Sequence, residues 1–96
     1  MTAIVAEFVS FLDTKVKGVL KGTAKLVITD EGSVMLDENG ATAGDAEADV
    51  TLIASETVFR NILSGDQNPM MAYMSGKLKV DGNTMRALKV SEILTS

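Results

Sequence analysis

Apolar and polar positions change their spacing several times along the chain, and each change marks an expected boundary between elements. Near the start, apolar residues return every three or four positions, which predicts an amphipathic helix over about residues 3–17. Residues 22–29 alternate between apolar and polar instead, and this period of two predicts a half-buried strand. The apolar positions of the helix are Ile4, Phe8, Phe11, Leu12 and Val16.

Three further segments have strand character and are separated by turn residues. Residues 33–37 and 48–54 alternate clearly, whereas residues 41–46 are poor in branched side chains and are expected at a sheet edge. The turns are Asp30-Glu31-Gly32 and Glu38-Asn39-Gly40, and Asn-Gly is the strongest short hairpin signal. The first three strands are therefore expected to pair antiparallel.

Beyond residue 54 the helical period returns, and residues 77–80 add one more strand. Short polar residues, glycine and proline stand where helices commonly begin or end. In order, they are Ser55 as a helix cap, Gly65 as a stop, Asn68-Pro69 as a helix start, Gly76 as a stop, Asp81-Gly82 as a turn and Asn83 as the last cap.

The expected order of elements is α-β-β-β-β-α-α-β-α. Two hairpins near the start favour antiparallel neighbours, and the helices between the fourth and fifth strands permit a crossover. We therefore expect one α+β domain over residues 1–96, with a five-stranded, mostly antiparallel sheet covered on one face by helices.

The composition excludes several classes of function. The 96 residues include no cysteine and no histidine, which excludes disulfides, zinc ribbons, thiol catalysis and the usual general base at neutral pH. The net charge is −4 and only 4% of residues are aromatic, so nucleic-acid binding is not expected. No basic segment precedes the first apolar residues, so we expect no signal peptide and a cytoplasmic location.

No set of catalytic residues is evident in the sequence, because its serines have no histidine to activate them. Asp45, Glu47 and Asp49 alternate along an expected strand edge and would share one face. Three such carboxylates hold Ca²⁺ or Mg²⁺ in some proteins, but an acidic row more often protects an exposed edge from pairing. We expect no enzyme activity, no metal and no cofactor.

Methionines are concentrated in one stretch. Met70, Met71 and Met74 are three of the six, and they lie between Pro69 and Gly76. Methionine recurs at adaptable apolar binding surfaces, but it is also a common filler of gaps in a core. From this pattern alone, the helices either complete a filled core or enclose an apolar slot against the sheet.

Several segments stand together in a recognisable order. They are Ala48-Asp49-Val50-Thr51, Asn68-Pro69, Gly76-Lys77-Leu78-Lys79-Val80-Asp81-Gly82 and Ala87-Leu88-Lys89. In this order the chain resembles the sterol carrier protein type-2 (SCP2-like) domain family, densely from residue 48 to 89 and more weakly from about residue 8. The resemblance implies a hydrophobic tunnel between sheet and helices that holds a sterol, fatty acid, fatty acyl-CoA or phospholipid, without catalytic residues.

With this resemblance, apolar side chains of the helices are expected to line the tunnel. In this chain Val90, Ser91 and Glu92 replace the family's final-helix glutamines, which flank the ligand entrance, and Ser91 and Glu92 are expected to border the mouth. Glu92 would repel an anionic head group, so a neutral lipid or a nearby lysine is expected there. The expected lining residues are Phe8, Phe11, Leu12, Phe59, Leu63, Met70, Met71, Met74, Met85, Leu88 and Ile93.

Two functions are compatible with this pattern. The leading hypothesis is a non-catalytic lipid-binding or lipid-transfer protein that makes weak, transient contact with membranes, aided by Lys15, Lys17, Lys21 and Lys25. The alternative is an accessory protein-interaction module of the same fold, with a filled core and no ligand. An open tunnel of roughly several hundred Å³ favours the carrier, and a closed slot favours the module.

Overall fold

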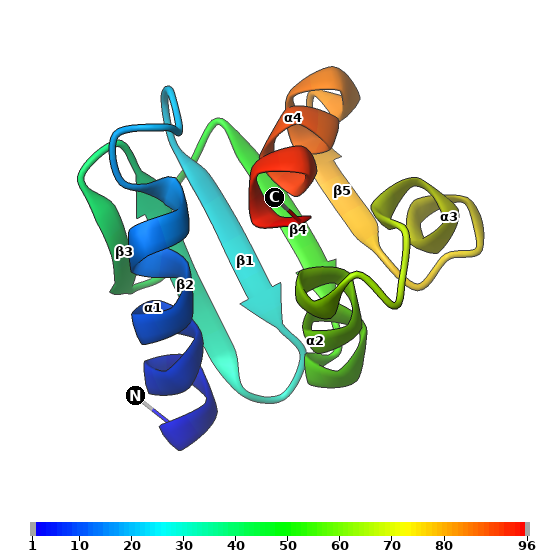
Figure 1. The fold of residues 1–96 in the computed structure, drawn as a ribbon, viewed down its shortest axis with the longest axis horizontal. Helices are drawn as coiled ribbons and strands as arrows, with labels where there is room; N and C mark the ends of the chain where they lie inside the picture. Colours follow the sequence, from blue (N-terminus) through cyan, green and yellow to red (C-terminus); the bar gives the residue numbers. More distant parts are fainter. Residues whose placement is uncertain (1, 96) are drawn as a thin grey trace.

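The fold is built on a five-stranded sheet, seen in a computed structural model that describes residues 2–95 (Figure 1). The strand order is β3-β2-β1-β4-β5, and every neighbouring pair is antiparallel except β1 and β4, which run parallel. This confirms the expected five-stranded, mostly antiparallel sheet. The strands are β1 (Ala24–Ile28), β2 (Gly32–Asp37), β3 (Gly40–Ala43), β4 (Val50–Ala54) and β5 (Lys79–Gly82).

Helices cover one face of this sheet, as expected. The side chains of Leu26, Val34 and Leu52 are in register on the covered face and are almost fully buried. Figure 1 shows α1, α2 and α4 in front of the sheet and the shortest helix, α3, beside β5 at the sheet edge. The helices are α1 (Ala3–Val16), α2 (Glu56–Ser64), α3 (Pro69–Met74) and α4 (Thr84–Thr95), so the element order is also the expected one.

The helices begin at the residues that the sequence indicates. A side-chain oxygen at the cap position accepts a hydrogen bond from a backbone N–H three residues later, which satisfies a donor that the helix itself leaves unpaired. Gly65 ends α2 in the left-handed conformation that glycine favours. The expected caps Ser55, Asn68 and Asn83 all make this contact, at 3.2, 3.2 and 3.1 Å, and Thr2 does so for α1 at 3.1 Å.

The third strand is shorter than expected. It lies at a sheet edge, as predicted, but it ends at Ala43 rather than at residue 46, and residues 44–49 are irregular. Asp45 pairs with Lys25 at 2.9 Å, while the Asp49 carboxylate accepts a hydrogen bond from the Thr23 N–H at 3.1 Å. The expected row of three carboxylates along a strand is therefore wrong, because two of them turn toward different partners.

No group of three acidic side chains within residues 2–95 comes close enough together to hold a metal ion. The expectation of a turn at Asp81-Gly82 is also wrong, because both residues belong to β5 and pair with β4. A side chain at Gly82 would lie 3.0 Å from the Asp49 carbonyl oxygen and 3.3 Å from the Val50 Cα. Glycine therefore allows β5 to approach β4 closely.

The core between the sheet and the helices is tightly packed. Leu12, Leu26, Leu52, Phe59 and Leu94 are at most 1% exposed. Side chains of this size that are fully removed from water supply most of the stabilisation of a small domain. Within the described part of the chain, none of the helices has the length and apolar character needed to cross a membrane.

Candidate functional site

An apolar hollow opens between α1 and α2. Glu7, Phe8 and Phe11 line it from α1, and Arg60, Leu63 and Ser64 line it from α2. On α1, Phe11 follows Glu7 and Phe8 by four and three positions, and on α2 Leu63 and Ser64 follow Arg60 by three and four, which places each set on one face. The hollow has a volume of about 180 Å³, and it unites three of the residues expected to line the tunnel, Phe8, Phe11 and Leu63.

Aromatic side chains form the floor and the rim of this α1–α2 hollow. The rings of Phe8 and Phe59 meet edge to face, with centroids 6.4 Å apart and an interplanar angle of 71°. Phe59 is buried and supports Phe8 from within the core, whereas Leu12, which was expected in the tunnel wall, is fully buried in the core and does not line the hollow. Phe11 is 50% exposed and stands at the rim, where the Lys15 ammonium lies 5.6 Å from its ring centroid.

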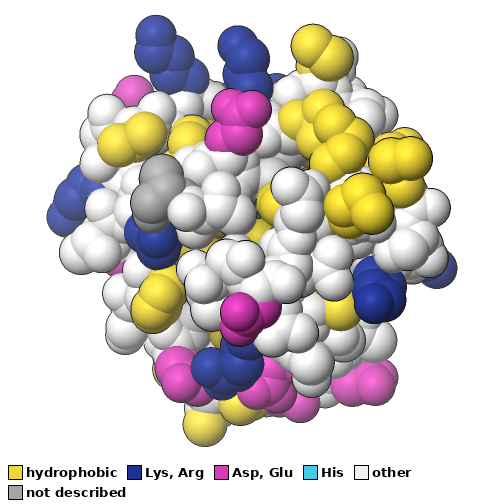
Figure 2. Space-filling view, turned by 45° about the vertical axis from the view of Figure 1, so that its right-hand side comes forward, with side chains coloured by type: hydrophobic (Ala, Val, Ile, Leu, Met, Phe, Trp, Pro, Cys, Tyr) yellow, Lys and Arg dark blue, Asp and Glu magenta, His cyan; other side chains and the backbone are white. Residues whose placement is uncertain are grey.

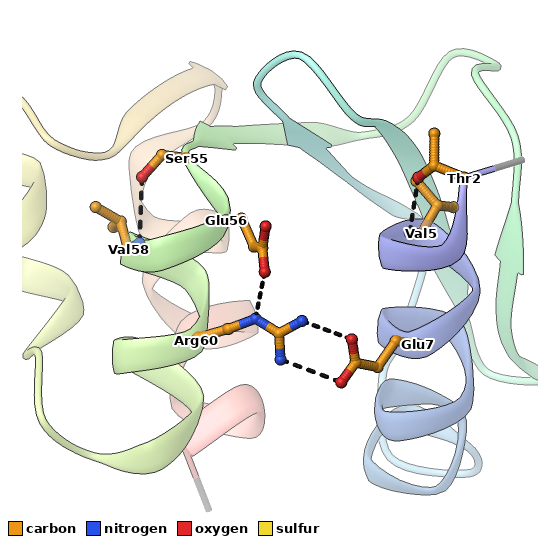
Figure 3. A network of polar contacts seen from close by, with 7 residues as sticks. All are labelled: Thr2, Val5, Glu7, Ser55, Glu56, Val58 and Arg60. Carbon is orange, nitrogen blue, oxygen red and sulfur yellow. Dashed lines mark hydrogen bonds and ion pairs between the residues drawn. The ribbon is translucent and has the colours of Figure 1, made fainter.

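A charged network crosses the hollow and joins the two helices (Figure 3). The Arg60 guanidinium donates from Nη2 to Glu7 Oε2 at 2.6 Å and from Nη1 to Glu7 Oε1 at 3.3 Å. Its Nε donates to Glu56 Oε2 at 2.7 Å, one helical turn earlier on α2. The same guanidinium lies over the Phe8 ring, 5.2 Å from the centroid. Arg60 is therefore held in place by two carboxylates and an aromatic face.

The network changes the acid strength of its members. The hydrogen bonds from Arg60, followed by its positive charge, hold the pKa of the Glu7 carboxyl below its usual value of 4.5. The hydrogen bonds to Glu7 and Glu56 raise the pKa of Arg60 above its usual value. Both side chains therefore carry their full charge at neutral pH.

The sequence interpretation missed Arg60 and Glu7 as site residues. The spacing of Glu56 and Arg60 does signal an ion pair on one helix face, four residues apart. Glu7 and Arg60, however, are 53 residues apart in the chain, and no local pattern indicates their contact. Only the packing of α1 beside α2 brings them together.

A second hollow, of about 210 Å³, lies between α3 and α4. Its lining includes Met70, Leu88, Ser91 and Glu92, which were expected in the tunnel wall and at its mouth. The Ser91 hydroxyl donates to the Ala87 carbonyl oxygen at 2.9 Å, so its proton is used within α4. Glu92 is exposed, so its carboxylate faces water beside this α3–α4 hollow.

The remaining expected residues lie elsewhere. Ile93 borders a third hollow, of about 220 Å³, between α4 and the loop after α1. Met71, Met74 and Met85 are 61%, 74% and 70% exposed. A wider depression of about 450 Å³ at the start of α1 includes none of the expected residues.

Exposed apolar side chains gather over α3 and the start of α4. Figure 2 shows them as a yellow area at the upper right, with a basic side chain below it. Lys77 and Lys79 follow α3 directly and are exposed. We call this area the α3–α4 patch, and its residues are Met70, Met71, Tyr73, Met74 and Met85.

The residues expected around one tunnel are thus divided between the packed core, separate hollows and the α3–α4 patch. The tunnel itself stays a prediction. Chemically, the α1–α2 hollow offers apolar surface beside a cation that is held in place. The lining residues named above include no nucleophile paired with a base, as covalent catalysis needs.

Comparison with known proteins gives sequence relatives of this chain. Hydroxysteroid dehydrogenase-like protein 2 of Mus musculus is 38% identical over 72 residues, which are 69% of this chain and 15% of that protein. A fatty acid-binding protein of Yarrowia lipolytica is 39% identical over 56 residues, 58% of this chain and 42% of that protein. The chain therefore spans less than half the length of either relative.

A solved structure agrees with the fold. The solution structure of sterol carrier protein-2 from Aedes aegypti, in complex with the C16 fatty acid palmitate, superimposes with a TM-score of 0.77 at 17% identity. The superposition covers 98% of this chain and 96% of that one. At this identity the likeness concerns the fold. The sequence profile of the SCP-2 sterol transfer family matches residues 9–95, so this chain belongs to that family.

Proposed function

We propose that this protein is a non-catalytic lipid carrier, which holds the apolar part of one lipid between its helices and its sheet and releases it to an acceptor. The observation that carries the proposal is the α1–α2 hollow, where the exposed Phe11 and the partly buried Leu63 lie beside Arg60, next to the buried Phe8 ring. Apolar side chains that line an open hollow, and that no other part of the protein covers, are suited to a ligand with a hydrocarbon chain.

The size of the hollow limits how the ligand would enter. Its volume of about 180 Å³ is below the roughly 300–1,000 Å³ of typical ligand pockets. A long chain would therefore have to part α1 from α2 and extend over Phe59 into the core. Burial contributes about 0.8 kcal/mol for each CH₂ group, so the many CH₂ groups of a long chain together would supply free energy to offset such a local rearrangement.

The relatives support a lipid as the ligand. One is named a fatty acid-binding protein, and the structure from Aedes aegypti holds palmitate. The family is one of sterol transfer, so a sterol, a fatty acid, a fatty acyl-CoA and a phospholipid are all candidate ligands. The dehydrogenase-like relative matches over only 15% of its length, so we infer no dehydrogenase activity for this chain.

The test is lipid binding by the purified protein, first stripped of lipid and then titrated with a fluorescent fatty acid. Phe11→Ala should weaken binding, because it removes the exposed wall of the hollow. Val19→Ala is the matched control, since Val19 is similarly exposed, at 56%, but lies outside that hollow. If native mass spectrometry finds no bound lipid and no probe binds, the carrier proposal is wrong.

A second candidate is the accessory protein-interaction module. The observation in its favour is the packed core, where Leu12, Phe59 and Leu94 leave little space between helices and sheet. A module of this kind would bind no lipid at any concentration below the micelle range. The same titration therefore decides between the two functions.

We also propose that the protein binds transiently to membranes through the α3–α4 patch. Flexible methionines adapt to an irregular apolar surface, and Lys77 and Lys79 supply positive charge beside them. Met71→Ser combined with Met74→Ser should reduce co-sedimentation with vesicles that contain an anionic phospholipid. An unchanged co-sedimentation would contradict this location of the membrane contact.

A further inference from the structure

The Arg60 guanidinium lines the apolar α1–α2 hollow and binds a carboxylate there, that of Glu7. Its two Nη atoms face the two oxygens of Glu7 in the parallel, two-bond geometry that guanidinium groups form with carboxylates. Its Nε is bound separately, by Glu56. The two sides of the guanidinium therefore have different partners, and one side can change its partner while the other is kept.

Glu7 is the partner that can leave. Its side chain is 57% exposed, so the carboxylate can turn into water without being buried elsewhere. Exposed ion pairs of this kind contribute little net stability, because water solvates the separated charges well. Glu56 lies on the same helix as Arg60 and is only 34% exposed, so it continues to orient the guanidinium.

Apolar side chains lie directly next to the Arg60 guanidinium. The Arg60 guanidinium lies over the Phe8 ring, and Phe8 in turn contacts Phe59 edge to face. Phe11 and Leu63 complete the walls of the hollow beside them. A ligand whose head group binds Arg60 would therefore lay its hydrocarbon chain on Phe11 and Leu63 first, and would reach the buried Phe8 and Phe59 rings as α1 and α2 separate.

We propose that Arg60 binds the carboxylate of a fatty acid, and that the Glu7 carboxylate occupies this position when no ligand is present. Glu7 is then an internal competitor: the ligand displaces it from Arg60, and the hydrocarbon chain enters where α1 and α2 separate. This inference rests on the proposed carrier function and deepens it by naming the head-group class and the residue that selects it. Arg60 also provides the positive charge that an anionic head group needs, whereas Glu92 at the expected mouth would repel such a group.

The experiment compares one acid with the alcohol of the same chain length, by isothermal titration calorimetry at neutral pH. The ligands are dodecanoate and dodecanol, and the proteins are the wild type, Arg60→Gln, Arg60→Lys and Glu7→Gln. Arg60→Gln should weaken dodecanoate binding about tenfold or more, because a charge-assisted, two-bond contact is lost. Arg60→Lys should fall in between, because an ammonium keeps the charge but not the paired geometry.

Glu7→Gln is the variant that separates a binding role from a structural one. Like Arg60→Gln, it removes the ion pair between α1 and α2, but it keeps Arg60 in place on Glu56 and over Phe8. Because it removes the competitor, it should strengthen dodecanoate binding up to about fivefold, a change opposite in sign to that of Arg60→Gln. Dodecanol binding should be the same for both variants.

Each contrary outcome has its own meaning. If Arg60→Gln weakens the acid and the alcohol equally, or if Glu7→Gln weakens the acid, Arg60 only holds the helices together and the inference is wrong. If dodecyl phosphate binds more tightly than dodecanoate and depends more on Arg60, the head group is a phosphate and the carboxylate assignment is wrong. If the wild type binds neither dodecanoate nor dodecanol, the carrier function itself fails.

Discussion

Truncation of Met74 tests whether α3 presents its methionines to solvent. Met74 is 74% exposed, so it buries only about a quarter of the area that a core methionine buries. Full burial of such a side chain contributes about 1.5–3 kcal/mol, so Met74→Ala should lower the free energy of unfolding by about 0.5 kcal/mol. A methionine in a tight core would cost about 2–5 kcal/mol instead.

The measurement is urea unfolding followed by far-UV circular dichroism, because the chain has no tryptophan for fluorescence. Leu78→Ala is the matched control, since Leu78 lies four residues later and is 3% exposed. It should cost about 2–5 kcal/mol. A loss above about 2 kcal/mol for Met74→Ala would refute the reasoning, because α3 would then be covered in solution by another part of the chain or by a second copy.

Three further predictions concern contacts that hold the helices in place. Asp13→Ala leaves the buried Ala41 N–H without its acceptor at 2.9 Å, so urea unfolding should show a loss of about 1–3 kcal/mol, and less for Asp13→Asn. Ser55→Ala removes the cap of α2 and should cost about 1 kcal/mol in the same assay, whereas Ser55→Asp should retain most of the stability. The pKa of Glu7 is lowered by Arg60, so its contribution to stability is complete above about pH 4.5 and is lost as the pH falls through the folded-state pKa. Glu7→Gln should therefore unfold with a weaker pH dependence than the wild type below pH 4.5, and identical pH profiles would contradict this.

Local signals in the sequence predicted most of the fold. Ser55, Asn68 and Asn83 are recognisable as caps because a cap uses a side chain and a backbone N–H only three residues apart. The alternation in residues 24–28 identifies the buried face of β1 in the same way, since the period of a strand is fixed by its geometry. Such interactions involve residues that are close in the chain, so they can be predicted from a single sequence.

The short elements were predicted less well. Residues 44–49 alternate like a strand, yet Asp45 and Asp49 turn toward Lys25 and toward Thr23 and Arg86, which come from distant parts of the chain. Asp81-Gly82 has the composition of a turn, but pairing with β4 extends the strand through it. In both places a tertiary partner outweighs the local preference.

The sequence by itself determined the order of elements, the buried faces of the central strands and the family, because each depends on local spacing or on residue order. It determined the faces of the long helices only in part: α1 buries Val5 and leaves the expected Phe11 half exposed, and α4 buries Ala87 and Val90 while Met85 is exposed. It did not determine which way α3 faces. A helix of six residues has too few turns for a periodic stripe, and in the structure only Ala72 of α3 is buried while Met71 and Met74 meet the solvent.

Tertiary structure alone decided the candidate site. Glu7 and Arg60 form one network although 53 residues separate them, because α1 and α2 cover the same face of the sheet and these two side chains reach across between them. The hydrophobic effect that drives this packing depends on area and not on sequence position. For that reason the residues expected around one tunnel could be recognised as apolar from the sequence, but their division between core, hollows and surface could not.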